Sequence, residues 1–146
     1  MGEPSVTPSS TQLPLSPSDE RMWAMLAHLS ILLNLFTAIL GPVAALIIYL
    51  IYRDRSRYVA YQSLQSLLLQ LIGWVGGGIL TGIAWAITGI LSALIVGICL
   101  IPVAIIISAI PLAALIYGIV GAVQSNNGVD FKYWLIGDWV RKTYTG

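Results

Sequence analysis

Residues 58–129 read YVAYQSLQSLLLQLIGWVGGGILTGIAWAITGILSALIVGICLIPVAIIISAIPLAALIYGIVGAVQSNNGV, and this run of 72 residues contains no charged side chain. An α-helix rises about 1.5 Å per residue and the hydrocarbon core of a bilayer is about 30 Å thick, so one crossing needs about 20 residues. The run is long enough for two membrane-spanning helices with an apolar connection. The sequence therefore predicts an integral membrane protein.

The composition supports this prediction and excludes several other classes of protein. The 146 residues are 58% hydrophobic and 9% charged, whereas soluble domains carry about 25% charged residues. The net charge of +1 excludes nucleic-acid binding through a basic surface. One cysteine and one histidine exclude a disulfide framework within the chain and a zinc site.

A second uncharged run, residues 22–52, precedes the long one. It is too long for one upright helix and short for two. Gly41 and Pro42 lie inside it, and proline disfavours helix at the residue before it, so a break is expected near Leu40. We predict one helix over 22–40 and a short helix over 42–52. A single tilted, kinked helix is the alternative that these residues leave open.

Within the uncharged residues 58–129 we predict two helices. The first is a long helix over 58–94, loosened at the Gly76 to Gly78 triplet, and the second is a helix over 98–124, bent by Pro102 and Pro111. The expected fold is an all-α integral membrane protein with four transmembrane helices, of which the second is short and the third long. All seven Lys and Arg then share one face, which the positive-inside rule makes cytoplasmic, so both termini are expected in the cytoplasm. Three spans satisfy the rule nearly as well.

The two ends of the chain differ from its middle. Residues 1–18 are rich in Pro and Ser and are expected to form a disordered tail before a four-helix domain over 19–127. In residues 128–146 aromatic and charged side chains alternate, as is typical of a segment lying at the membrane surface. The aromatic residues predicted to be interfacial are Phe131, Tyr133, Trp134 and Trp139.

A few polar residues lie within the predicted spans, namely His28, Asn34, Gln62 and Gln65. We interpret them as interhelical hydrogen-bonding groups; a pore lining is a second interpretation of the glutamines. A buried imidazole can also bind haem iron or chlorophyll magnesium as an axial ligand. No second ligand or cofactor motif accompanies His28, so we predict no cofactor and no metal.

Small residues recur at four-residue spacing along the predicted helices, a pattern that allows close helix packing in lipid. The glycines in these rows are Gly73, Gly77, Gly78, Gly82, Gly89, Gly97 and Gly118. Four such rows are many for a small bundle, so one of them is interpreted as a contact with another membrane protein subunit or a second copy of the chain.

The sequence contains no recognisable set of catalytic residues, because no two acids lie in the predicted spans and no nucleophile has a recognisable base partner. We therefore predict a non-enzymatic accessory, scaffold or assembly subunit of a larger membrane complex. A transport component is the alternative. It is the less favoured of the two because the spans carry no charge.

Four ordered segments resemble a known family: WAMLAHLS at 23–30, Gly41 and Pro42 followed by an aliphatic run into RDRS at 53–56, YVAYQSLQS at 58–66, and GVDFKYWLIGD at 128–138. The chain resembles, over about residues 19–142, a family of small bacterial four-helix membrane proteins of unknown function related to the Tic-translocon membrane subunit of chloroplast import. Gln62 stands where that family usually has His, and Trp134 where it has Pro. The resemblance implies a helical hairpin at residues 22–52, a bacterial inner (plasma) membrane location and, by distant kinship, the transport alternative.

Overall fold

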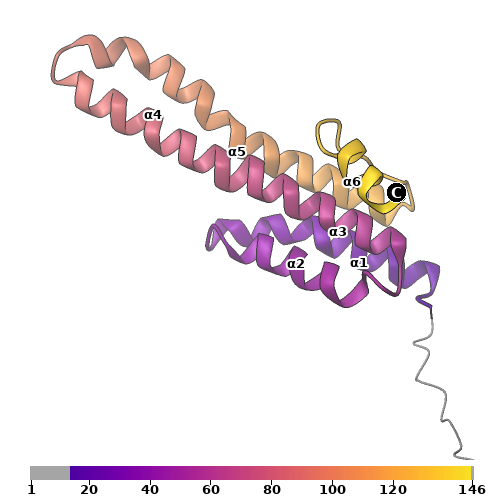
Figure 1. The fold of residues 1–146 in the computed structure, drawn as a ribbon. Helices are drawn as coiled ribbons and strands as arrows, with labels where there is room; N and C mark the ends of the chain where they lie inside the picture. The colour runs from indigo at the N-terminus through magenta and orange to yellow at the C-terminus, as the bar shows by residue number, and fades with distance from the viewer. Residues whose placement is uncertain (1–13, 146) are drawn as a thin grey trace, which may run out of the picture.

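The computed structural model describes residues 14–145, and within this range the chain is helical and contains no strand. Figure 1 shows a long antiparallel helical pair with a shorter helical hairpin packed against one end of it. The elements are α1 (Pro17–Leu29), the 3₁₀ segment η1 (Ser30–Leu35), α2 (Leu40–Tyr52), α3 (Arg57–Leu69), the π-helical segment η2 (Gln70–Gly76), α4 (Gly77–Ser92), α5 (Val96–Asn126) and α6 (Gly137–Thr145).

The short hairpin begins earlier than predicted. Ser16 caps α1 by accepting a hydrogen bond from the Asp19 N–H at 3.2 Å, and Pro17 occupies the first turn, where its missing N–H costs nothing. The chain reverses at residues 36–39, so Gly41 and Pro42 lie in the first turn of α2 instead of breaking a helix. The single kinked helix is therefore wrong, and the break lies a few residues before the predicted position.

The long helix predicted over 58–94 is present as a continuous rod, Arg57–Ser92, made of α3, η2 and α4. Ser56 caps it by accepting from the Val59 N–H at 3.1 Å. The glycine triplet makes no turn, and the loosening lies in the wider turns of η2, which begin at Gln70 and end at Gly76, the first glycine of the triplet. At about 1.5 Å per residue the rod is about 54 Å long.

Helix α5 follows a tight turn and runs antiparallel to the rod with Pro102 and Pro111 inside it. Arg57–Ser92 and Val96–Asn126 are the two helices among the described residues that are long and apolar enough to cross a membrane. Helix α2 has 13 residues, about 20 Å, which is less than the thickness of the hydrocarbon core. Two candidate spans are thus established, while four spans and the orientation of the termini stay predictions.

Many large apolar side chains lie on the surface of the protein, and several polar side chains lie in its interior. Large apolar side chains point outward, as at Phe36 (83% exposed) and Ile90 (74%), whereas Gln62 and Gln65 are fully buried. This arrangement suits a protein whose solvent is lipid, because polar groups must then find partners inside the bundle.

At both ends of the chain the helix boundaries in the structure differ from the predicted ones. Of the expected disordered tail, residues 1–13 lie outside the described residues, residues 14–16 precede α1, and residues 17 and 18 are already helical. At the other end, residues 128–136 are irregular and lead into α6. This C-terminal segment folds back over α3 and α5, as Figure 1 shows.

Candidate functional site

Buried polar side chains join α1 and η1 to the rod and form a polar network with two halves, one hydrogen-bonded around His28 and the other around Gln70. The polar side chains of α3 and η2 recur every three or four residues and so share one face, which meets the polar positions of α1 and η1. None of them is more than 6% exposed. They are His28, Ser30, Asn34, Gln62, Gln65, Ser66 and Gln70.

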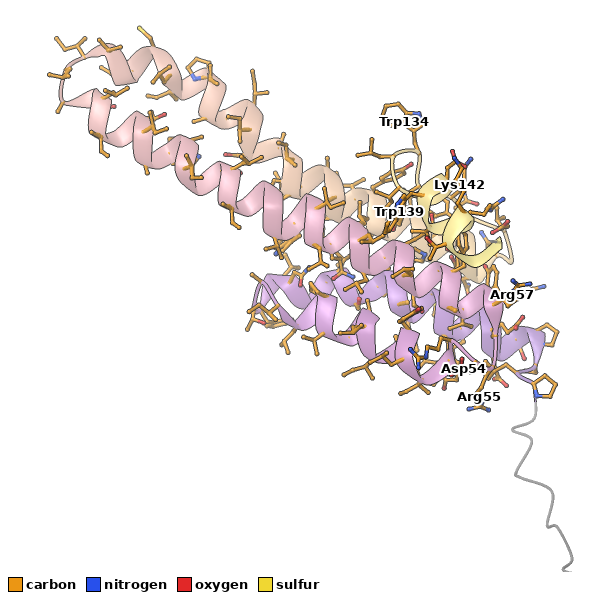
Figure 2. All side chains as sticks on the ribbon, in the orientation of Figure 1. Asp54, Arg55, Arg57, Trp134, Trp139 and Lys142 are labelled. Atoms are coloured by element: carbon orange, nitrogen blue, oxygen red, sulfur yellow. The ribbon has the colours of Figure 1, made fainter. Side chains whose placement is uncertain are left out.

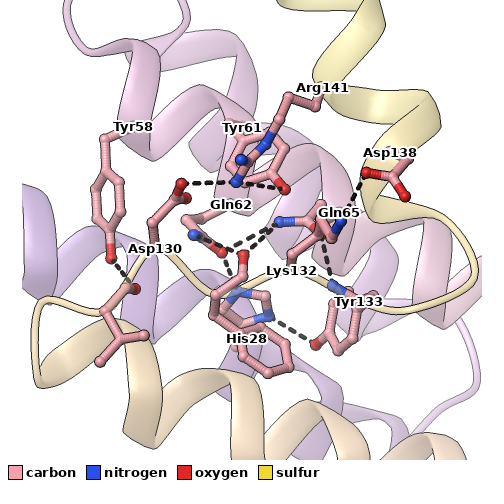
Figure 3. A network of polar contacts seen from close by, with 12 residues as sticks. His28, Tyr58, Tyr61, Gln62, Gln65, Asp130, Lys132, Tyr133, Asp138 and Arg141 are labelled. Carbon is pink, nitrogen blue, oxygen red and sulfur yellow. Dashed lines mark hydrogen bonds and ion pairs between the residues drawn. The ribbon is translucent and has the colours of Figure 1, made fainter.

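His28 is the hub of the network and bridges three parts of the chain (Figure 3). Its Nε2 lies 3.0 Å from Gln62 Oε1, and its Nδ1 lies 2.8 Å from Tyr133 Oη. An amide oxygen can only accept, so Nε2 carries the proton and Nδ1 accepts from the tyrosine hydroxyl. Both ring nitrogens therefore contact protein groups, which leaves neither directed at an axial metal.

The side chains of Gln62 and Gln65 form hydrogen bonds with the backbone of the C-terminal segment, as a neighbouring strand would do in a sheet. Both side-chain amides donate to the Phe131 carbonyl oxygen, at 3.1 and 3.0 Å, and Gln65 Oε1 accepts from the Tyr133 N–H at 2.9 Å. Backbone groups that are buried without a partner are costly, so these two side chains allow an irregular segment to enter the bundle.

The other half of the network fixes the short hairpin. Gln70 Nε2 donates to Ser30 Oγ at 2.9 Å, and its Oε1 accepts from Asn34 Nδ2 at 3.2 Å. Asn34 Oδ1 in turn accepts from the Gly41 N–H at 3.0 Å, which satisfies an otherwise free donor at the start of α2. A Cβ on Gly41 would lie 2.7 Å from the Ser30 carbonyl oxygen, so this position requires glycine.

Aromatic rings close the network on the side of α5. Tyr133 packs edge-on against His28, Tyr117 and Phe131, with ring centroids 5.4, 4.8 and 4.9 Å apart. Its burial raises the pKa of the Tyr133 phenol far above the ordinary value. The hydroxyl therefore stays protonated and remains a donor to His28 at every physiological pH.

The charged residues that the structure describes gather at one end of the bundle, which we call the charged end. Figure 2 shows Asp54, Arg55, Arg57 and Lys142 there. The charged end comprises Asp19, Glu20, Arg21, Arg53, Asp54, Arg55, Arg57, Asp130, Lys132, Asp138, Arg141 and Lys142.

Two ion pairs lie within the C-terminal segment, and one of their members, Arg141, also joins the segment to α3. Arg141 donates to Asp130 at 2.6 Å and lies over the ring of Tyr61, and Lys132 Nζ lies 2.7 Å from Asp138 Oδ1. The hydrogen bond from Lys132 lowers the pKa of the Asp138 carboxyl. Both pairs are largely exposed, so each contributes little to stability.

The structure places the predicted interfacial aromatics on two sides of the C-terminal segment. Trp134 and Trp139 are 84% and 62% exposed, as a surface position requires. Tyr133 is 1% exposed and Phe131 is half-buried, because alternate side chains of this extended stretch point into the bundle. For these two residues the interfacial prediction is replaced by an internal role.

The predicted packing glycines also divide into two groups. An added Cβ would lie 2.6 Å from Ala114 Cβ at Gly73, 2.8 Å from Ile110 at Gly77 and 2.9 Å from Ile31 at Gly118. Gly97 is likewise enclosed, by backbone of the last turn of α4. An added Cβ at Gly78, Gly82 or Gly89 meets nothing within 4 Å, so these three do not pack against the described residues of the chain.

Ser66 and Tyr117 belong to the network although neither was a sequence-predicted site. Tyr133 also belongs to it, although the sequence predicted an interfacial position for this residue. The four-residue spacing of Gln62, Ser66 and Gln70 is the signal that could have identified Ser66. Within residues 14–145 no group of three or more His, Cys, Asp or Glu could hold a metal ion.

Comparison with known proteins identifies a family. A family model described as the magnetosome magnetite crystal formation protein family matches residues 19–140. No curated protein and no solved structure matches the chain. The family that matches is not one related to the Tic translocon, so the resemblance drawn from the four sequence segments is wrong. Those segments are short, and matches to short motifs carry a risk of false positives.

Proposed function

Because the chain belongs to the magnetosome magnetite crystal formation protein family, we propose that it is a non-catalytic accessory or assembly subunit of the membrane that encloses the crystal. The family consists of magnetosome membrane proteins involved in crystal formation. The proposal concerns how this chain takes part: by organising the membrane and its proteins rather than by binding iron at the mineral surface.

The observation that carries this proposal is the segregation of charge. Magnetite is an iron oxide, and carboxylate oxygens are among the ligands that hard metal cations prefer in proteins. From Asp19 onward every carboxylate lies at the charged end, and residues 58–129 contain none. The turns at 36–39 and 93–95, which point away from the charged end, consist of Phe, Thr, Ala, Ile and Leu.

The orientation in the membrane follows from the same distribution. All seven Lys and Arg lie at the charged end, which the positive-inside rule assigns to the cytoplasm. Both termini then lie in the cytoplasm, and the α4–α5 turn lies toward the lumen that holds the crystal. In this orientation the lumenal side of the chain offers no carboxylate to the mineral.

The shape of the chain supports an assembly role. The α4–α5 pair extends beyond the short hairpin, and Gly78, Gly82 and Gly89 leave one side of α4 smooth. Small residues allow another membrane helix to approach closely and gain dispersion contacts. We assign this side of α4 to contact with another protein of the same membrane.

Replacement of single carboxylates in cells that lack the native chain tests the proposal. Asp54 is exposed, and its pairing with Arg53 at 3.4 Å is loose. We expect Asp54→Asn to restore crystal size and number like the wild type, as measured by electron microscopy, because its carboxylate faces the cytoplasm. Gly82→Leu, which fills the smooth side of α4, should fail to restore them while the protein still accumulates. Loss of crystals with Asp54→Asn and rescue by Gly82→Leu would contradict the proposal.

A further inference from the structure

An apolar groove lies between the C-terminal segment and the long helical pair. Its volume is about 370 Å³, within the size range of small-molecule sites. Leu69, Ile72 and Gly73 form one wall, and Ala113, Ala114 and Tyr117 of α5 form the other. Residues 133–136 cover the end nearest the charged end.

The lining of the groove selects against a polar ligand. It contains no charged side chain, and its two hydroxyl groups are already engaged. Tyr133 Oη lies 2.8 Å from His28 Nδ1, and Tyr117 Oη accepts from the Trp134 N–H at 3.1 Å. An alkyl chain is the ligand that gains most from such walls, because it needs no hydrogen bond and fills the space with dispersion contacts.

The direction of the groove matches that of a lipid chain in a bilayer. Along α5 the lining runs from Tyr117 to Ile110, seven residues or about 10 Å, away from the charged end and into the apolar part of the pair. Trp134, which is 84% exposed, stands at the other end, where indole rings favour the head-group layer. A phospholipid placed here has its head group beside Trp134 and one acyl chain along α5.

We propose that this groove is a binding site for one acyl chain of a membrane phospholipid, which seats the C-terminal segment against the bundle from the lipid side. The inference rests on the membrane embedding proposed above. It goes beyond that function by assigning a ligand to the groove. The head group makes no contact that the lining provides, so the site recognises the chain and not the charge of the lipid.

Native mass spectrometry of the full chain released from lipid nanodiscs tests the site. Two lipids with the same oleoyl chains, phosphatidylglycerol and phosphatidylcholine, serve as probes in separate preparations. We expect one retained phospholipid per chain in both, with bound fractions within about threefold of each other, because dispersion contacts do not depend on head-group charge.

Two variants locate the site. Ala113→Phe places a ring in the groove and should lower the bound fraction about tenfold, since it removes the contacts that hold the chain. Ala109→Phe makes the same change on an exposed position of α5 outside the groove and should keep the bound fraction within about twofold. Ala113→Leu is a smaller filling that should give an intermediate loss, and it replaces Ala113→Phe if that variant loses helicity.

Three results would overturn the proposal: no retained lipid in the wild type, equal loss with Ala109→Phe and Ala113→Phe, or retention of phosphatidylglycerol alone. A change of oligomer size with Ala113→Phe at unchanged lipid content would also overturn it, because the groove would then hold a protein. Thiol labelling of the topology, described below, distinguishes a failed lipid site from a failed membrane orientation, because it does not depend on the groove.

Discussion

Replacement of Gln65 by Leu should release the C-terminal segment from the bundle while leaving the helices folded. Gln65 Oε1 accepts from the Tyr133 N–H at 2.9 Å, and Gln65 Nε2 donates to the Phe131 carbonyl oxygen at 3.0 Å. In the variant the Phe131 oxygen keeps its bond from Gln62 at 3.1 Å. The backbone N–H of Tyr133 loses its acceptor, and it stays away from water because Tyr133 is only 1% exposed.

The magnitude follows from that single orphaned donor. A buried polar group left without a partner costs about 1–3 kcal/mol, and the lost bond to Phe131 adds little because that oxygen remains satisfied. A loss of about 2 kcal/mol corresponds to a shift of about 30-fold in the equilibrium between docked and undocked C-terminal segments. Leucine resembles glutamine in size, so no large cavity should add to this figure.

Hydrogen exchange of the reconstituted full chain measures this equilibrium. Amides of residues 131–140 should exchange about 30-fold faster in Gln65→Leu, whereas amides of α4 and α5 should exchange as in the wild type. Gln124→Leu is the matched control, because this half-buried side chain on α5 makes no hydrogen bond with another described residue. Wild-type exchange in Gln65→Leu, or equal acceleration in Gln124→Leu, would refute the role given to Gln65.

Three further predictions concern single contacts. His28→Gln should cost about 1 kcal/mol, since interhelical hydrogen bonds in membranes average about 0.6 kcal/mol, and the purified wild type should show no haem or chlorophyll absorption band; a stoichiometric band lost on substitution would contradict both statements. Gly73→Ala should lower the thermal midpoint, because its Cβ meets Ala114, whereas Gly82→Ala should hold or raise it, because its Cβ meets nothing and alanine favours helix. Lys132 lowers the pKa of Asp138, so their pair contributes stability above the unfolded carboxyl pKa of about 4 and loses it as pH falls through the lower folded value. Lys132→Gln removes this contribution at every pH, so hydrogen exchange of α6 should be faster than in the wild type at neutral pH and should increase less on acidification; identical pH profiles would disprove the coupling.

Much of the fold could be predicted because its causes are local. The charge-free run of residues 58–129 and the turn near 93–95 are visible in the sequence, and α5 begins and ends within two residues of the predicted 98–124. The start of α2 was harder to predict. Pro42 fits both a helix break and the first turn of a helix, and only the bond from the Gly41 N–H to Asn34 distinguishes them.

The polar network could be predicted only in part. His28 and Gln62 could be predicted to form interhelical hydrogen bonds, because both lie in apolar runs of the sequence. Tyr133 could not be predicted as a partner of His28, because it lies 105 positions away in the chain and its aromatic neighbours suggested a surface location. Alternation of aromatic and charged residues is the same for a segment on the membrane and for one whose alternate side chains enter the bundle. The glycine spacing likewise located the rows but could not tell Gly73, which meets Ala114, from Gly82, which faces outward.

The orientation of the chain in the magnetosome membrane tests the central claim most directly, because the proposed role depends on which side carries the charged end. The exposed Cys99 is first replaced by Ala, and single cysteines are then introduced at Thr143 in α6 and at Leu94 in the α4–α5 turn. A membrane-impermeant thiol reagent is applied to intact isolated magnetosomes, whose outer surface is the cytoplasmic one. We predict labelling at Thr143→Cys and protection at Leu94→Cys; labelling at Leu94→Cys with protection at Thr143→Cys would place the carboxylates on the crystal side and contradict the account.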